Sequence, residues 1–512
     1  MTNPTTGSGK RIAKNTLLLY LRSIIIMILS IYSSRVLLKT LGVDDFGLYG
    51  VVGGVVAMFS SLKSVLAAAV QRFLNFEKGK GNNQQVQKIF NMSILVHLAI
   101  ALLFALIVES FGCWYICNHL IVPHNNIDTA LFVFHCSVIA SMITIYTIPY
   151  DAVVIANERM DFYAIQSITD VTLRLAIIFL LPILPFSFIR SYAVLILVVA
   201  ILIRIMSVIY TNRFPECKKL KYWNKETFKE LISFAGWNFF GCIAYSLIEE
   251  GTNLILNLFG GVVANAARGL TYQIRSAIMT LSNNVLVASQ PFITQRAANV
   301  DIATFWTYIF IQSRVMFYIM MLTGLPIYIY AEQILRLWLD TIPEYTVEFV
   351  RAIVIYTIVM SFQKSLDLSF KAYNKMATYQ IVDACCLLLT IPSVYVALKL
   401  GAPLYYAFLL FSVIRLVDYI AVLFVAKYKN NLLISEYFYN VVIPSIIGFI
   451  IFFFVDFLFG HIPESENFIL LLVYMMMSII IAIVLLYLLS FRRNEKEMVN
   501  RVLLSLKSKI KR

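Results

Sequence analysis

The chain has 512 residues, of which 60% are hydrophobic and 14% charged, and it carries a formal net charge of +14. Apolar runs of about twenty residues recur along its length, which excludes a soluble globular protein and predicts an all-α polytopic membrane protein. The basic residues form no contiguous soluble module, so a nucleic-acid partner is not expected, and the polar first fifteen residues predict no cleavable signal peptide.

Fourteen apolar segments are predicted to be transmembrane helices joined by short loops. They cover residues 16–38, 46–74, 88–112, 129–155, 163–181, 189–211, 229–258, 264–291, 305–330, 346–369, 379–398, 404–426, 437–458 and 467–490.

A polar stretch at 211–229 separates the first six predicted helices from the rest and is the best candidate for a domain border. The tail is amphipathic in pattern, which predicts either a segment lying on the inner leaflet or a solvated basic tail. The predicted parts are an N-terminal six-helix lobe (1–213), a cytoplasmic linker (214–228), a C-terminal six-helix lobe (229–430), an appended pair of helices (431–491) and the tail (492–512).

A weak internal repeat supports two related lobes. Gln71 follows Gly42 by 29 residues and Gln290 follows Gly261 by 29, so the two copies are shifted by 219 residues. A parallel repeat of two six-helix halves is a transporter layout, in which the substrate site lies between the halves near the membrane midplane. The sequence therefore predicts a central cavity between the lobes.

The basic residues are distributed unequally between the two predicted sides of the membrane. One side, which includes both termini, carries 27 of the 42 Lys and Arg residues, whereas the other carries four. Because short cytoplasmic loops retain Lys and Arg, both termini are predicted to be cytoplasmic.

The remaining eleven basic residues fall within predicted helices, where a charge in lipid is costly. Arginine suits phosphate because its planar guanidinium offers paired donors and stays charged. The alternative for each residue is pairing with an acid or snorkelling to an interface. Six of these cations, in the opening helices of both lobes, are the candidate ligands for an anionic group: Arg22, Arg35, Lys63, Arg268, Arg275 and Arg314.

Acidic and amide side chains in two predicted helices are candidates for ion coupling, because carboxylates that face a cavity can bind Na⁺ or a proton. An equal alternative is that the two glutamates neutralise the cavity arginines. The candidates are Glu249, Glu250, Asn253 and Asp383.

Other intramembrane charges are interpreted as structural. Arg204 and Arg351 lie near helix ends and are predicted to snorkel. The locally spaced pairs are Asp170–Arg174, Lys364–Asp367 and Arg415–Asp418.

No catalytic constellation is found. The five histidines and seven cysteines show no metal-ligand spacing, and no glycine-rich phosphate loop precedes a Lys-Ser/Thr pair. Cys113 and Cys117 can share a helical face, either as a disulfide or as small packing residues. The sequence therefore predicts a protein that is not an enzyme, with no metal and no cofactor other than Na⁺ or H⁺ as a coupling ion.

A series of short motifs occurs in order along residues 11–430. They are Asn15-Thr16, Tyr20-Leu21-Arg22, Tyr32-Ser33-Ser34-Arg35, Leu41-Gly42-Val43-Asp44-Asp45-Phe46-Gly47, Gln71-Arg72-Phe73-Leu74, Pro149-Tyr150-Asp151-Ala152, Ala156-Asn157-Glu158, Gly236-Trp237 and Asn265-Ala266-Ala267-Arg268-Gly269. Together they resemble the Wzx-type O-antigen flippases of the multidrug/oligosaccharidyl-lipid/polysaccharide exporter superfamily.

This resemblance implies two six-helix bundles in a V around a central cavity, plus two appended helices. It also implies an activity, the movement of an undecaprenyl-pyrophosphate-linked oligosaccharide from the inner to the outer leaflet of the bacterial inner membrane for polysaccharide and lipopolysaccharide biosynthesis. In the related peptidoglycan-precursor flippases, arginines of the first and eighth helices hold the pyrophosphate, and a sodium site draws on helices seven, eleven and twelve. The expected partners are this glycolipid and membrane lipids, for a monomer acting alone or with polysaccharide assembly machinery.

Two other functions compete with the flippase. A cation-coupled drug antiporter of the same superfamily would need an acidic cavity, whereas the predicted membrane interior is net basic. A polysaccharide polymerase or ligase would need a sizeable outer loop, and none is longer than about sixteen residues by the predicted spans.

Overall fold

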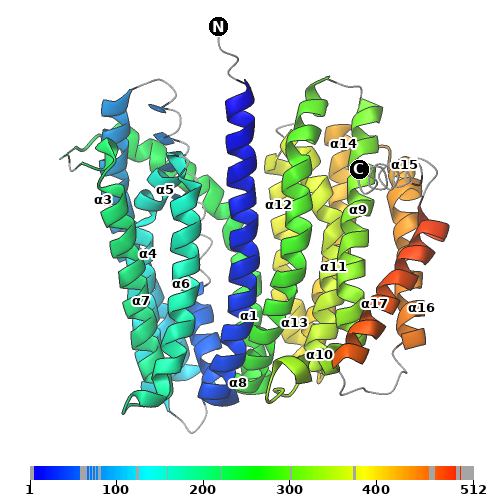
Figure 1. Cartoon of the computed structure of the whole chain (residues 1–512), viewed down its shortest axis with the longest axis horizontal. Coiled ribbons are helices and arrows are strands. Elements are labelled where there is room, and N and C mark those ends of the chain that lie inside the picture. Colours follow the sequence, from blue (N-terminus) through cyan, green and yellow to red (C-terminus); the bar gives the residue numbers. More distant parts are fainter. Residues whose placement is uncertain are drawn as a thin grey trace, which may run out of the picture. The chain divides into compact units, whose positions relative to one another are not determined.

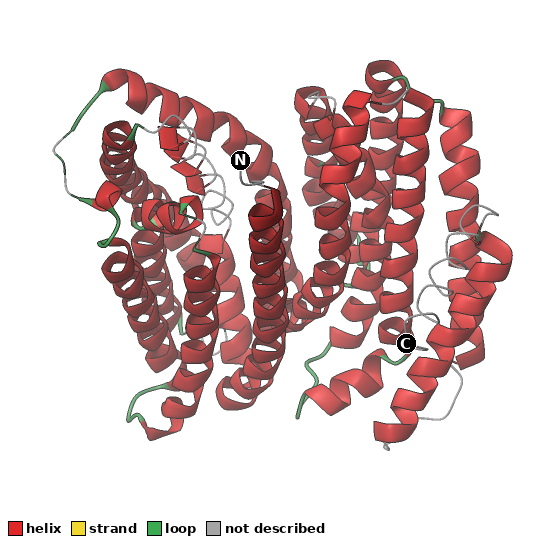
Figure 2. Cartoon of the chain, turned by 45° about the horizontal axis from the view of Figure 1, so that its top comes forward, coloured by secondary structure: helices red, strands yellow, loops and turns green. Residues whose placement is uncertain are grey.

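The computed structural model describes residues 5–57, 66–67, 70–71, 73–74, 77–78, 82–122, 126–157, 159–218, 220, 222–299, 302–372, 376–459, 468–491 and 496. Every regular element in these ranges is a helix, and none of them contains a strand, which confirms the predicted all-α class (Figure 2). Contacts divide the chain into two compact units: unit 1 is Met1–Gln273 with Val394–Leu404, and unit 2 is Ile274–Ser393 with Tyr405–Arg512.

Unit 1 consists of long helices joined by short connections (Figure 1). Two short 3₁₀ turns, η2 (Leu181–Ile183) and η3 (Pro215–Cys217), follow α6 and α7. The helices are α1 (Thr5–Ala57), α3 (Asn83–Asn118), α4 (Ile127–Tyr146), α5 (Ile148–Ala156), α6 (Met160–Leu180), α7 (Phe188–Thr211) and the first part of α8 (Lys225–Asn299).

Unit 2 contains the rest of α8 and the helices that follow it, with two π-helical turns among them, except that the part of α13 from Val394 onward belongs to unit 1. They are α9 (Ile302–Ile329), α10 (Ala331–Trp338), α11 (Thr346–Ala372), α12 (Met376–Leu388), α13 (Thr390–Lys399), α14 (Tyr406–Asn430), α15 (Ile434–Tyr437), η4 (Phe438–Val442), α16 (Ile443–Phe459), α17 (Phe468–Leu485) and η5 (Leu486–Ser490).

Breaks inside these helices have identifiable causes. Thr147 separates α4 from α5 two residues before Pro149, and Leu389 separates α12 from α13 three residues before Pro392. Proline removes a backbone donor, and its ring clashes with the carbonyl four residues earlier, so the helix is interrupted in the preceding turn.

Twelve helical segments of the described residues are long and apolar enough to cross a membrane, so the chain is a multi-pass membrane protein. Two of them, Leu21–Gly54 and Ser246–Thr280, contain a glycine with non-helical backbone angles, Gly42 (φ 77°) and Gly261 (φ 61°). Each of these segments includes parts of two predicted spans that meet without a loop. This explains the difference from the fourteen predicted spans.

The border between the units does not coincide with the predicted linker at 214–228. It lies within α8, between Gln273 and Ile274, because the preceding part of α8 packs into unit 1. The Tyr115 hydroxyl of α3 donates to the Leu254 carbonyl at 3.4 Å, and Leu254 and Val262 belong to the apolar core of α1, α3, α4 and α7. The six-helix lobes at 1–213 and 229–430 stay a prediction.

Candidate functional site

A cavity of about 640 Å³ lies within unit 1, lined by residues of α1, α4, α5, α6 and α7. Five ionisable residues other than tyrosine line it: Arg22, Asp151, Asp170, Arg174 and Arg204. Three guanidinium groups and two carboxylates leave an excess of one positive charge when all are ionised. A hydrated cavity with this balance favours an anionic group.

Two of the three arginines in the cavity are paired with acids. Arg204 Nη1 lies 2.7 Å from Asp151 Oδ2, and Arg174 Nε lies 3.0 Å from Asp170 Oδ1. The second pair confirms the predicted local pairing. Arg204 was expected to snorkel, and that prediction is wrong: its side chain is 11% exposed, because α5 brings Asp151 opposite α7.

Arg22 is the cation of this cavity that has no acidic partner among the described residues. Its guanidinium carbon lies 4.7 Å from the centre of the Tyr163 ring, and its Nε is buried without a hydrogen-bond partner. The ring face holds the guanidinium by a cation–π interaction but leaves hydrogen-bond donors available. The predicted ligand Arg22 is therefore placed where it could bind an anion.

A second polar cluster lies in unit 1 where α8 folds back on itself at Gly261. Arg268 Nη2 donates to the Glu249 carbonyl at 2.7 Å, and Arg268 Nη1 lies 3.7 Å from Glu250 Oε2. Asn253 Nδ2 contacts Glu250 Oε2 at 3.4 Å. An ion pair between an arginine and a glutamate, the alternative left open by the sequence, is therefore observed for Arg268 and Glu250, whereas Glu249 contributes its backbone carbonyl. Arg268 is a buried, paired cation.

Three asparagines complete this cluster. Asn265 donates to the backbone and side-chain oxygens of Asn253, both at 2.8 Å, and Asn257 donates to Asn265 at 2.9 Å. Burial leaves no water to satisfy these amides, so they pair with one another. Sequence reasoning missed Asn257 and Asn265, although three amides within one apolar hairpin were a usable signal.

Asp383 belongs to a polar cluster in unit 2, on α11, α12 and α14. Arg415 Nη1 lies 2.9 Å from Asp383 Oδ1 and 3.0 Å from Asp418 Oδ2, and Gln363 donates to Asp383 at 2.6 Å. The predicted local pair Arg415–Asp418 is confirmed. Asp383 is also paired with Arg415, which sequence spacing could not show because Arg415 lies on another helix 32 residues away.

The other predicted anion ligands are described within their own units. Arg35 is half-buried on α1, and Lys63 lies outside the described residues. In unit 2, Arg275 lies 5.1 Å from the Tyr356 ring centre, and Arg314 donates to the Asn440 carbonyl of the π-helical turn at 2.7 Å. Arg314 is 3% exposed and holds η4 in place.

Comparisons with known proteins agree with this architecture. The chain matches the family model described as polysaccharide biosynthesis protein over residues 12–297, more than half of its length. No curated protein matches it.

Three solved structures show the fold. The lipid II flippase MurJ in an inward closed conformation has a TM-score of 0.69 at 13% identity, covering 92% of this chain and 98% of that one. An inward-facing multidrug resistance MATE family transporter of the MOP superfamily has a TM-score of 0.69 at 11% identity, covering 81% and 98%. A MOP superfamily transporter from Pyrococcus furiosus has a TM-score of 0.60 at 11% identity, covering 83% and 96%. The chain is thus a multi-pass membrane protein that belongs to the polysaccharide biosynthesis protein family and has the helical fold of the MATE and MurJ transporters.

Proposed function

We propose that this protein is a flippase, not an enzyme, and that it moves an undecaprenyl-pyrophosphate-linked oligosaccharide from the inner to the outer leaflet of the bacterial inner membrane. The observation that carries the proposal is the cavity of unit 1, in which Arg22 is a cation without an acidic partner among the described residues. A pyrophosphate would supply the missing negative charge and accept hydrogen bonds from the guanidinium. Membership of the polysaccharide biosynthesis family supports a glycan as the cargo.

The experiment is leaflet-resolved transport in proteoliposomes. A polyprenyl-pyrophosphate glycolipid should cross faster than the same glycan on a neutral lipid, because only the former pairs with the cavity cation. A cationic dye tests the drug-antiporter alternative, which the similarity to a multidrug transporter raises. Transport of the dye without transport of the glycolipid would contradict the proposal.

Topology is a part of this proposal, with both termini in the cytoplasm. Cysteines introduced at Ser187, in the connection between α6 and α7, and at Lys218, after η3, are exposed and lie on opposite predicted sides. In a cysteine-free background, an impermeant maleimide added to intact cells should label Ser187→Cys and leave Lys218→Cys unlabelled until the membrane is opened. Labelling of both from the same side would contradict the predicted topology.

We also propose that Asp383 takes up the coupling ion, either Na⁺ or H⁺. Its cluster contains two carboxylates and one guanidinium, so it carries one excess negative charge when all are ionised. Asp383 is 25% exposed, whereas Asp418 is fully buried, so Asp383 is the carboxylate that a cation can reach. The hydroxyl and amide oxygens of Tyr379 and Gln363 lie in the same cluster and are suitable ligands for a hard cation.

Asp383→Asn should transport glycolipid at a basal rate that no longer responds to an imposed Na⁺ or pH gradient. Glu250→Gln is the matched comparison, because Glu250 faces Arg268 in the cluster of unit 1. We expect Glu250→Gln to keep the response to the gradient. A response lost in Glu250→Gln and kept in Asp383→Asn would place the coupling site, with Glu249 and Asn253, in unit 1.

A further inference from the structure

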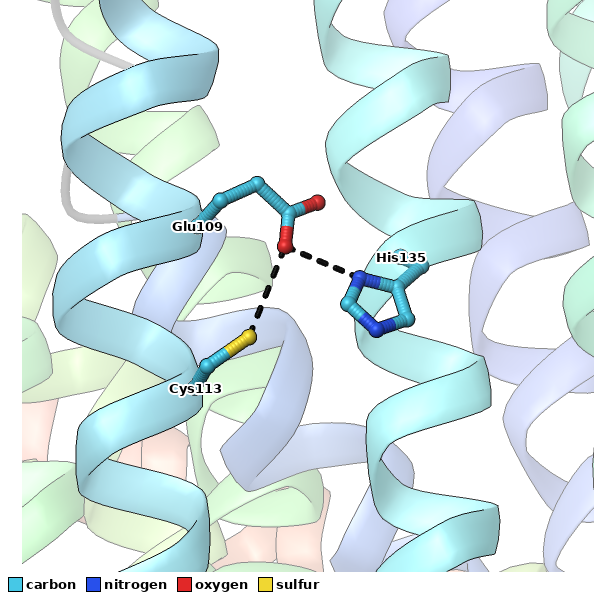
Figure 3. A group of neighbouring side chains, drawn as sticks. All are labelled: Glu109, Cys113 and His135. Atoms are coloured by element: carbon cyan, nitrogen blue, oxygen red, sulfur yellow. Dashed lines mark hydrogen bonds and ion pairs between the residues drawn. The ribbon is translucent and has the colours of Figure 1, made fainter.

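One group of potential metal ligands in the described part of the chain joins two helices of unit 1, and none of its members lines the cavity. Glu109 and Cys113 lie one turn apart on α3, and His135 lies opposite them on α4 (Figure 3). His135 Nδ1 lies 2.9 Å from Glu109 Oε2, and Cys113 Sγ lies 3.5 Å from the same oxygen. The three potential ligand atoms lie within 4.8 Å of one another.

We propose that Glu109, Cys113 and His135 form a binding site for a divalent transition-metal ion of the Zn²⁺ type, which fastens α3 to α4. Zinc takes carboxylate oxygen, thiolate sulfur and imidazole nitrogen at about 2.0–2.3 Å, so tetrahedral ligands are separated by about 3.3–3.8 Å. The observed separations need only small side-chain rotations to reach that geometry. Three protein ligands leave a fourth position for water or a lipid oxygen.

The charge of the group matches a divalent cation. One carboxylate, one thiolate and one neutral imidazole sum to minus two, so the complex with a divalent ion is neutral. Neutrality matters here because the surrounding side chains face lipid: Leu106 is 69% exposed and Ile139 is 46% exposed. An ionised carboxylate at such a surface is costly unless it is compensated.

The backbone around the group is fixed in advance. Gly112, next to Cys113, lies so close to Phe134, next to His135, that an added Cβ would come within 2.1 Å of the ring. Phe134 is fully buried in the core of unit 1, so it cannot easily move away. The two helices are therefore held at the separation that brings the ligands together. Metal binding would then lose little conformational entropy, because the backbone is already in place.

An ion can reach the group from the predicted outer side. Glu109 is nine residues from the end of α3 and His135 eight residues from the start of α4, or about 12–14 Å along each helix. The 36 residues of α3 extend about 54 Å, compared with about 30 Å for the hydrocarbon core, so α3 projects beyond the core. His135 is 48% exposed and Glu109 is 34% exposed.

Cobalt binding to the purified full-length protein tests the site, because thiolate coordination gives a charge-transfer absorption in the near ultraviolet. We expect one Co²⁺ per chain, displaced by Zn²⁺, with the absorption lost in Cys113→Ser. Glu109→Gln and His135→Gln should each weaken binding by more than about ten-fold. Cys385→Ser, at an exposed cysteine of unit 2, should bind as the wild type does. An absorption that persists in Cys113→Ser would place the metal on another thiol, such as Cys117, and overturn the assignment.

A second measurement needs no variant and so does not depend on the folding of one. Alkylation of each cysteine is followed by mass spectrometry with and without Zn²⁺. We expect Zn²⁺ to protect Cys113 and to leave Cys385 as reactive as before. Equal alkylation of Cys113 with and without Zn²⁺ would overturn the proposal, and the pair Glu109–His135 would then be a simple hydrogen bond.

Discussion

Arg22→Ala is expected to reduce glycolipid translocation by about ten- to hundred-fold, because it removes a charge-assisted contact worth about 1.5–3 kcal/mol. The guanidinium lies over the Tyr163 ring and has no acidic partner among the described residues, so its loss leaves no carboxylate unpaired. The variant should therefore reach the membrane in normal amounts. Arg22→Lys should recover only part of the activity, because lysine keeps the charge but cannot offer paired planar donors.

The control for Arg22→Ala is Arg159→Ala in the same unit. Arg159 pairs with Asp161 at 2.8 Å, with both side chains about half exposed, so its removal should have little effect. The readout is the initial rate of leaflet-resolved transport per molecule of reconstituted protein. Transport by Arg22→Ala at the wild-type rate would show that this cavity is not part of the substrate path.

The largest effect on stability is expected from Arg415→Ala. Arg415 is buried between Asp383 and Asp418, and its removal leaves two carboxylates close together without a counter-charge. Breaking a buried ion pair in this way costs about 3–5 kcal/mol. The protein should unfold at a distinctly lower temperature in detergent, whereas Arg336→Ala, at an exposed i,i+4 pair, should change stability by about 0.5 kcal/mol or less.

A compensating variant checks the cause. Adding Asp383→Asn and Asp418→Asn to Arg415→Ala removes the uncompensated charges and should restore part of the lost stability. Thermal unfolding of the wild type, Arg415→Ala, the double variant Asp383→Asn/Asp418→Asn and the triple variant would measure the coupling between Arg415 and the two aspartates. If the triple variant were no more stable than Arg415→Ala, lost packing and not unpaired charge would be the cause.

The fold could be predicted from the sequence to the extent that it depends on hydropathy and on local breaks. The span predicted at 189–211 is the helix Phe188–Thr211, and Pro149 and Pro392 lie just after the interruptions of their helices. The short helix α10 was missed, because eight residues with a polar face do not form an apolar run. The π-helical turns at η4 and η5 do not alter the hydropathy pattern, so the sequence did not predict them.

The sites were predicted less completely, because their partners come from different helices. Local pairs such as Arg174 with Asp170 follow from helical spacing. Arg204 and Asp151 are 53 residues apart, and His135 and Glu109 are 26 apart, so no spacing rule relates them. An arginine within a predicted span could be identified from sequence, but whether it was paired depended on the packing of its helix.

The fold-back of α8 at Gly261 has a consequence for how the chain enters the membrane. Its first segment carries Glu249 and Glu250, whereas Asn265 and Arg268, which satisfy the polar groups around them, arrive only with the second segment. If the two segments entered the membrane separately, each ionised side chain would lie in lipid without its partner, at a cost of about 2.5–3.5 kcal/mol for each charge. With no loop between the segments, both reach the translocon together, and the cost falls as the pairs form. We therefore expect the two segments of α8 to enter the membrane together as a hairpin and not as single helices.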